Sequence, residues 1–101
     1  MAHHVTVERS ALPEDQGTVV ALGDDTVALF RIGEMVTVYR NHCPHRGGPV
    51  GEGLVVGGIV TCPWHGNRFD VASGRCVSDP GLPALTRARF RIDGDRIVIE
   101  G

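Results

Sequence analysis

Two short boxes, each pairing a cysteine with a histidine, constrain this chain more than any other feature. Cys43-Pro44-His45 has the form C-x-H, and Cys62-Pro63-Trp64-His65 has the form C-x-x-H. Sixteen residues separate His45 from Cys62. Two thiolates and two imidazoles on glycine-rich loops are metal ligands by residue type. The fold is therefore expected to bring the two loops together around a metal.

The third cysteine, Cys76, lies outside both boxes. An odd number of cysteines in a sequence without an export signal does not indicate a disulfide framework. We interpret Cys76 as a small apolar residue near the second box.

Length and composition predict one small domain spanning residues 1–101. The 101 residues are 42% apolar but only 5% aromatic, so the core is small. A formal net charge of −2, with no lysine, argues against a general nucleic-acid binder. No apolar run approaches the roughly 20 residues of a membrane-spanning helix, and the first residues lack the apolar stretch of a signal peptide. We therefore expect a cytoplasmic protein without a membrane anchor.

Alternating apolar residues and tight turns predict an all-β chain. Strands are expected at Val5–Glu8, Thr18–Ala21, Thr26–Ile32, Met35–Tyr39, Leu54–Val56, Ile59–Thr61, Ala88–Ile92 and Arg96–Glu100. The third of these is apolar on both faces, so we place it centrally. Gly57-Gly58 and Asp93-Gly94 predict tight hairpins, and the first hairpin would bring the two boxes close together.

The middle of the chain differs in composition from its ends. Nine of the 14 glycines lie between Cys43 and Leu82, and five of the six prolines lie between Pro44 and Pro83. With a Cys/His box on each side of the predicted hairpin, this composition favours a scaffold of two loops for a metal site. We place that scaffold at about residues 41–83.

Together the boxes and their surroundings resemble the binding motif of Rieske-type iron–sulfur proteins. The family pattern is C-x-H, a spacer of about 16 residues, and then C-x-x-H-G, with cysteine and histidine ligands to a [2Fe–2S] cluster. Phe69-Asp70, the glycine turn Ala72-Ser73-Gly74 and a third, proline-containing loop at Asp79–Pro83 also match the family.

The resemblance implies both a fold and a set of ligands. The fold is a small antiparallel β-sandwich or barrel with a cluster-binding subdomain of two Gly/Pro-rich loops. Cys43 and Cys62 would hold one iron, and His45 and His65 the other. The backbone N–H groups of the glycines in the two loops are expected to point at the sulfurs; these are Gly47, Gly48 and Gly66.

Departures from the high-potential members of the family narrow the implied function. Those proteins carry an extra cysteine in each box, where this chain has Gly48 and Trp64. They also carry a serine and a tyrosine near the cluster, where this chain has Asn67 and Phe69. Fewer hydrogen-bond donors imply a potential near the low end of the Rieske range, roughly −150 mV.

These features are similar to those of a soluble Rieske ferredoxin. Such a carrier passes single electrons from a flavin-dependent ferredoxin reductase to a terminal oxygenase, works as a monomer and is not itself an enzyme. A terminal oxygenase adds a large catalytic domain with its own iron site, which 101 residues cannot hold. Trp64, Arg46 and Arg68, within or beside the boxes, are candidate docking residues.

Two other functions stay open at this point. The small subunit of a larger redox enzyme, such as assimilatory nitrite reductase, resembles this fold, although many such subunits lack the four ligands present here. A structural zinc module also uses two cysteines and two histidines, but zinc fingers usually place like ligands together. Metal analysis distinguishes the zinc module, and co-purification with a large flavin or sirohaem partner identifies the subunit.

Overall fold

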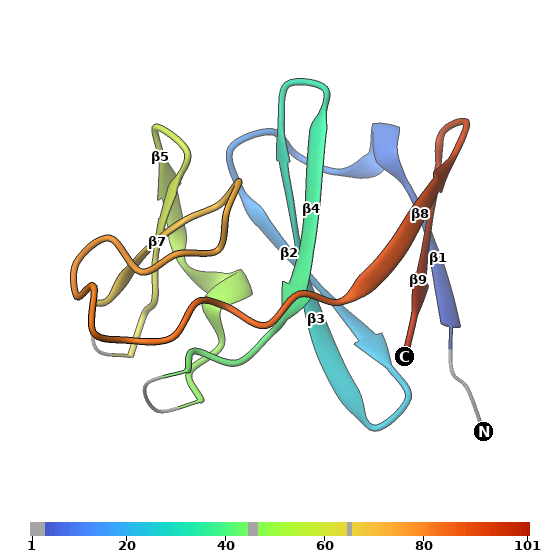
Figure 1. Cartoon of the computed structure of the whole chain (residues 1–101). Coiled ribbons are helices and arrows are strands. Elements are labelled where there is room, and N and C mark those ends of the chain that lie inside the picture. Colours follow the sequence, from blue (N-terminus) through green and yellow to red (C-terminus); the bar gives the residue numbers. More distant parts are fainter. Residues whose placement is uncertain (1–3, 45–46, 65) are drawn as a thin grey trace.

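The computed structural model describes residues 4–44, 47–64 and 66–101, which form three small antiparallel sheets (Figure 1). The first sheet contains β1 (His4–Glu8), β9 (Arg96–Glu100) and β8 (Arg89–Asp93), in that order. The middle sheet contains β2 (Gly17–Leu22), β3 (Asp25–Ile32) and β4 (Met35–Arg40). The third contains β5 (Leu54–Val56), β6 (Ile59–Thr61) and β7 (Arg68–Asp70). Two short 3₁₀ turns, η1 (Arg9–Ala11) and η2 (Val50–Glu52), complete the elements.

The all-β prediction is confirmed, and all eight predicted strands are present with ends that differ by at most one residue. The sequence did not predict β7. This strand has three residues, of which only Phe69 is apolar and buried, so no alternating pattern marks it. It forms because it pairs with β6, where Phe69 lies opposite Val60. In the part of the chain that the structure describes, no helix is long and apolar enough to cross a membrane.

Strand β3 is central, as its two apolar faces predicted. It pairs with β2 on one side and with β4 on the other. Ala28 and Phe30 face one hydrophobic cluster, and Val27 and Leu29 face the other, all at 1% exposure or less. The middle sheet therefore separates two cores, one toward the first sheet and one toward the third.

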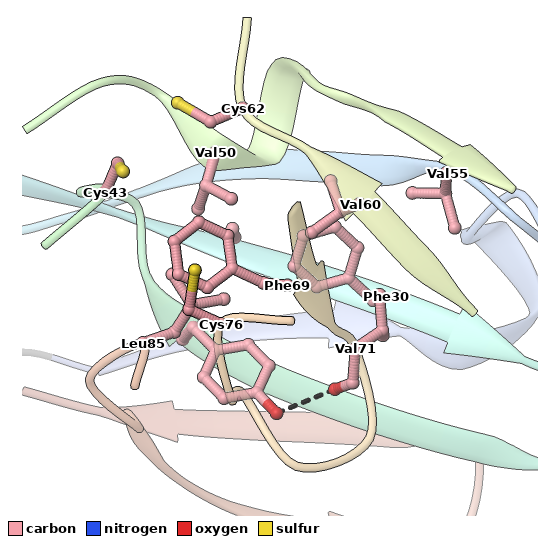
Figure 2. Close-up of a cluster of buried hydrophobic side chains, with 12 residues drawn as sticks. Phe30, Cys43, Val50, Val55, Val60, Cys62, Phe69, Val71, Cys76 and Leu85 are labelled. Carbon is pink, nitrogen blue, oxygen red and sulfur yellow. Dashed lines mark hydrogen bonds between the residues drawn. The ribbon is translucent and has the colours of Figure 1, made fainter. Parts of the chain in front are cut away.

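The core between the middle and third sheets contains all three cysteines (Figure 2). Its members are Ala28, Phe30, Tyr39, Cys43, Val50, Val55, Val60, Cys62, Phe69, Val71, Cys76 and Leu85. The hydroxyl of Tyr39 donates a hydrogen bond of 2.7 Å to the carbonyl of Val71, so this buried polar group is satisfied.

The loop-rich part of the chain leaves the middle sheet at the end of β4 and returns to the same strand (Figure 1). On return, the N–H of Arg40 donates to the carbonyl of Thr86 at 2.8 Å, and the N–H of Ala88 donates to the carbonyl of Val38 at 3.0 Å. Strand β4 thus holds both ends of the segment that carries the two boxes.

We expect Leu29→Ala to lower the free energy of unfolding by about 2–5 kcal/mol, because it leaves a cavity in a fully buried position. Val56→Ala, at a position 66% exposed, is the control and should cost less than about 1 kcal/mol. Urea denaturation monitored by circular dichroism measures both. Equal losses in the two variants would contradict the central placement of β3.

Candidate metal centre

The two box-bearing loops close with the same pattern of backbone hydrogen bonds. In the first, the N–H of Cys43 donates to the carbonyl of Gly48 at 2.8 Å, and the N–H of Gly47 donates back to the carbonyl of Cys43 at 2.7 Å. In the second, the N–H of Cys62 donates to the carbonyl of Asn67 at 2.8 Å, and the N–H of Gly66 donates to the carbonyl of Cys62 at 3.1 Å. Each cysteine is therefore fixed at the base of a tight turn.

A glycine four residues after each cysteine makes this turn possible. Gly47 has a φ of 72° and Gly66 a φ of 75°, values that residues with a side chain rarely adopt. Their N–H groups donate to the carbonyls of Cys43 and Cys62, so the prediction that they point at the sulfurs is wrong. Closing the turn takes these two donors.

The two thiols lie together at one end of the buried cluster, near Val50 (Figure 2). Both are free, with 4% of Cys43 and 1% of Cys62 exposed. Burial raises the pKa of the Cys62 thiol, and the neighbouring Cys43 raises it further. A hydrogen bond from the backbone N–H of Trp64 acts in the opposite direction, because it favours the thiolate.

The first loop approaches the second most closely at Gly48. A Cβ placed on this glycine would lie 2.9 Å from the sulfur of Cys62 and 3.1 Å from Cβ and Cγ of Trp64. Only a residue without a side chain allows the backbone of one loop to touch the cysteine of the other. The position that holds an extra cysteine in the high-potential proteins is thus a contact point between the loops.

Secondary structure on both sides positions the loops. Cys62 directly follows β6, and the tight β5–β6 hairpin brings the two boxes together as predicted. Asn41, one residue after β4 and 6% exposed, joins the first loop to the middle sheet. Its Oδ1 accepts a hydrogen bond of 2.7 Å from the N–H of Gly51, and its Nδ2 donates to Oγ1 of Thr26 at 3.3 Å. Sequence analysis missed Asn41, for which a lone asparagine after a strand was the only signal.

The predicted ligands His45 and His65 lie outside the described residues, as does Arg46. Their roles stay predictions. Among described residues, His42 does not face the thiols. Its Nε2 lies 2.6 Å from Oδ1 of Asp25, and this hydrogen bond is the main cause that lowers the pKa of the Asp25 carboxyl.

Residues that follow the second box also reach this core. Cys76 is buried in it, 7% exposed, as its interpretation as a small apolar residue predicted. From the third loop, Leu82 packs against the same cluster, while Asp79, Pro80 and Pro83 are exposed. The loop thus covers the core through one side chain.

The thiol pair suits a metal that takes sulfur ligands. Two adjacent buried cysteines without a disulfide bond supply two thiolates once their protons leave, and metal binding drives that loss. The apolar surroundings exclude water from the side that faces the core. Within residues 4–44, 47–64 and 66–101, no group of three or more His, Cys, Asp or Glu residues forms a competing site.

Comparison with known proteins points to one family. A family model described as "Rieske [2Fe-2S] domain" matches residues 2–89. The chain is 32% identical over 88 residues to apoptosis-inducing factor 3 of Mus musculus, which covers 87% of this chain but only 14% of that protein. It is 27% identical over 89 residues to the ferredoxin component of the naphthalene 1,2-dioxygenase system of Pseudomonas aeruginosa, covering 88% of this chain and 86% of that protein.

Two solved structures share the fold. One is a chain of the complex of reduced oxygenase and oxidized ferredoxin in carbazole 1,9a-dioxygenase, with a TM-score of 0.82, 23% identity, and coverage of 94% of this chain and 99% of that one. The other is a putative NADH-dependent nitrite reductase small subunit from Mycobacterium tuberculosis, with a TM-score of 0.78, 25% identity, and coverage of 100% and 96%. These likenesses confirm the predicted fold class.

Substituting Gly48 tests the contact between the loops. We expect Gly48→Ala to lower the free energy of unfolding by about 1–3 kcal/mol, because its methyl group would overlap the sulfur of Cys62 and the base of Trp64. The same overlap should reduce the iron retained per chain. Gly81→Ala is the matched control, since its Cβ would meet only the end of the Asp79 side chain, at 3.2 Å. Urea denaturation and iron analysis measure both variants, and equal values for the two would contradict the contact.

Proposed function

Since the chain belongs to the Rieske [2Fe-2S] domain family, whose cofactor is a [2Fe–2S] cluster, we propose that it is a one-electron carrier of the ferredoxin kind. The observation that carries this proposal is the pair of matching closed loops, which bring two free, buried thiols together. The likeness to a dioxygenase ferredoxin component, which extends over most of both chains, supports it.

We propose Cys43 and Cys62 as the ligands of one iron, and His45 and His65 as the ligands of the other. The bound cluster supplies reversible uptake of a single electron. The protein holds the two thiolates at the base of closed turns, so little rearrangement is needed between redox states. The N–H of Trp64 stabilises negative charge on Cys62, and the apolar core keeps water from that side.

The surface beside the second box supplies a docking area in this proposal. Pro63, Trp64 and Gly66 are all exposed, and Trp64 exposes 56% of its area. Its base packs close to Gly48, so the aromatic ring projects from a fixed point. A flavin-dependent ferredoxin reductase and a terminal oxygenase are the proposed partners, bound transiently. The carbazole dioxygenase complex, in which a ferredoxin and an oxygenase are found together, supports the second.

A second function, the small subunit of a nitrite reductase, is favoured by the full-length likeness to the mycobacterial protein. The two functions differ in the lifetime of the complex. A carrier is isolated alone, whereas a subunit co-purifies with a large flavin or sirohaem protein when both are expressed from their native source. Gel filtration with absorption detection separates these outcomes.

The direct test of the proposal is metal analysis of freshly purified protein. Iron, acid-labile sulfide and zinc are measured, with absorption spectra before and after dithionite. We expect two irons and two sulfides per chain and a brown colour that bleaches on reduction. Stoichiometric zinc in a colourless protein would overturn the proposal in favour of a structural zinc module.

Removing one proposed histidine ligand tests the link between cluster and stability. We expect His65→Ala to give a colourless protein that melts at a lower temperature, because a group bound only by the folded state stabilises that state. His4→Ala, on an exposed position of β1, is the control and should keep both colour and melting temperature. An unchanged melting temperature in colourless His65→Ala would show that the cluster contributes nothing to stability.

Truncating the exposed tryptophan tests the docking area. We expect Trp64→Ala to reduce the second-order rate of electron transfer to the oxygenase about tenfold, the effect of losing one aromatic anchor worth about 1.4 kcal/mol. Iron content and absorption spectrum should not change. Val77→Ala, at an apolar position 48% exposed, is the control. Stopped-flow absorption measures the rates, and equal rates for the two variants would exclude Trp64 from the interface.

A further inference from the structure

The segment that contains Cys76 runs back along β7. The N–H of Asp70 donates to the carbonyl of Arg75, and the N–H of Val77 donates to the carbonyl of Arg68, both at 2.8 Å. Between these bonds, Cys76 forms an isolated bridge with Phe69. The segment therefore lies beside the strand that leads out of the second loop.

At the end of this segment, Ser78 contacts three groups through its hydroxyl oxygen. Oγ accepts a hydrogen bond of 3.0 Å from the N–H of Arg68. It donates to Oδ1 of Asn67 at 3.5 Å, and it lies 3.6 Å from the sulfur of Cys76. One serine thus joins the start of β7, the side chain of Asn67 and the buried thiol of Cys76.

Asn67 connects this serine to the second box. Its backbone carbonyl accepts the N–H of Cys62 at 2.8 Å, which closes the loop that holds that cysteine. Because Oδ1 faces Ser78, the Nδ2 group of the same carboxamide is directed away from Ser78. The hydroxyl of Ser78 therefore selects one orientation of an amide donor at the base of the loop.

We propose that Ser78 is a positioning residue that acts through Asn67 to raise the reduction potential of the cluster. The inference rests on the proposed function. Fixed N–H donors close to a cluster stabilise the negative charge that an added electron brings, and so raise the potential. Loss of the Ser78 hydroxyl releases both the N–H of Arg68 and the carboxamide of Asn67, so the second loop holds its donors less firmly.

The first test compares reduction potentials of the cluster-loaded protein. In Ser78→Ala, the ratio of reduced to oxidised protein at the wild-type midpoint should fall about fivefold, the effect of one hydrogen bond of about 1 kcal/mol. Ser73→Ala is the matched control, because the hydroxyl of Ser73 also accepts a backbone N–H, that of Arg75 at 3.3 Å, but makes no contact with Asn67 among its recorded bonds. Redox titration followed by absorption and by electron paramagnetic resonance of the reduced form measures each ratio.

An isosteric pair keeps the test valid if alanine impairs folding. Ser78→Thr retains the hydroxyl and should keep the wild-type potential, whereas Ser78→Val has the same shape without the hydroxyl and should show the fivefold fall. Equal potentials for the threonine and valine variants would overturn the proposal.

A double-mutant cycle tests whether the effect passes through Asn67. Asn67→Leu should lower the potential by itself, and adding Ser78→Ala to it should produce no further change. An equal fall in both backgrounds would show that Ser78 does not act through Asn67, and would overturn the inference. If the wild-type protein binds no cluster, the proposed function itself fails. A wild-type cluster whose potential is insensitive to Ser78 overturns this inference alone.

Discussion

The contact between Gly48 and the sulfur of Cys62 is the constraint on which the candidate centre depends. Two loops close on themselves by the same pair of backbone hydrogen bonds, and each holds a cysteine at its base. Without a side chain at Gly48, the backbone of the first loop lies directly against Cys62 and Trp64. The loops therefore meet as two preformed turns, and the two thiols come together without any disulfide bond.

The middle sheet makes this meeting possible because it is buried on both faces. One face of β3 packs toward the first sheet, and the other packs under the cysteines. The loop-rich segment leaves from β4 and is tied to β4 again on its return, and Asn41 fixes the first loop to β3 through Thr26. A rigid base thus supports loops that contain little regular structure of their own.

Much of the framework could be predicted from the sequence, because its signals are local. Alternating apolar residues give eight strands, and the two apolar faces of β3 give its central place. Strand β7 could not be predicted, since its three residues become a strand only by pairing with β6. The direction of the Gly47 and Gly66 N–H groups was also predicted wrongly, because composition shows that glycine permits a close approach but not which acceptor it meets.

The sequence by itself determined the chemistry of the centre. Two cysteines and two histidines at fixed spacing specify the ligand types, and the glycines and prolines around them specify loops. Only the tertiary structure decided which residues support those loops. Asn41 and Ser78 reach their partners across distances in sequence that no local pattern encodes, Asn41 to Gly51 and Ser78 to Asn67. Residue types follow from the ligands' chemistry, whereas hydrogen-bond partners follow from how the sheets pack.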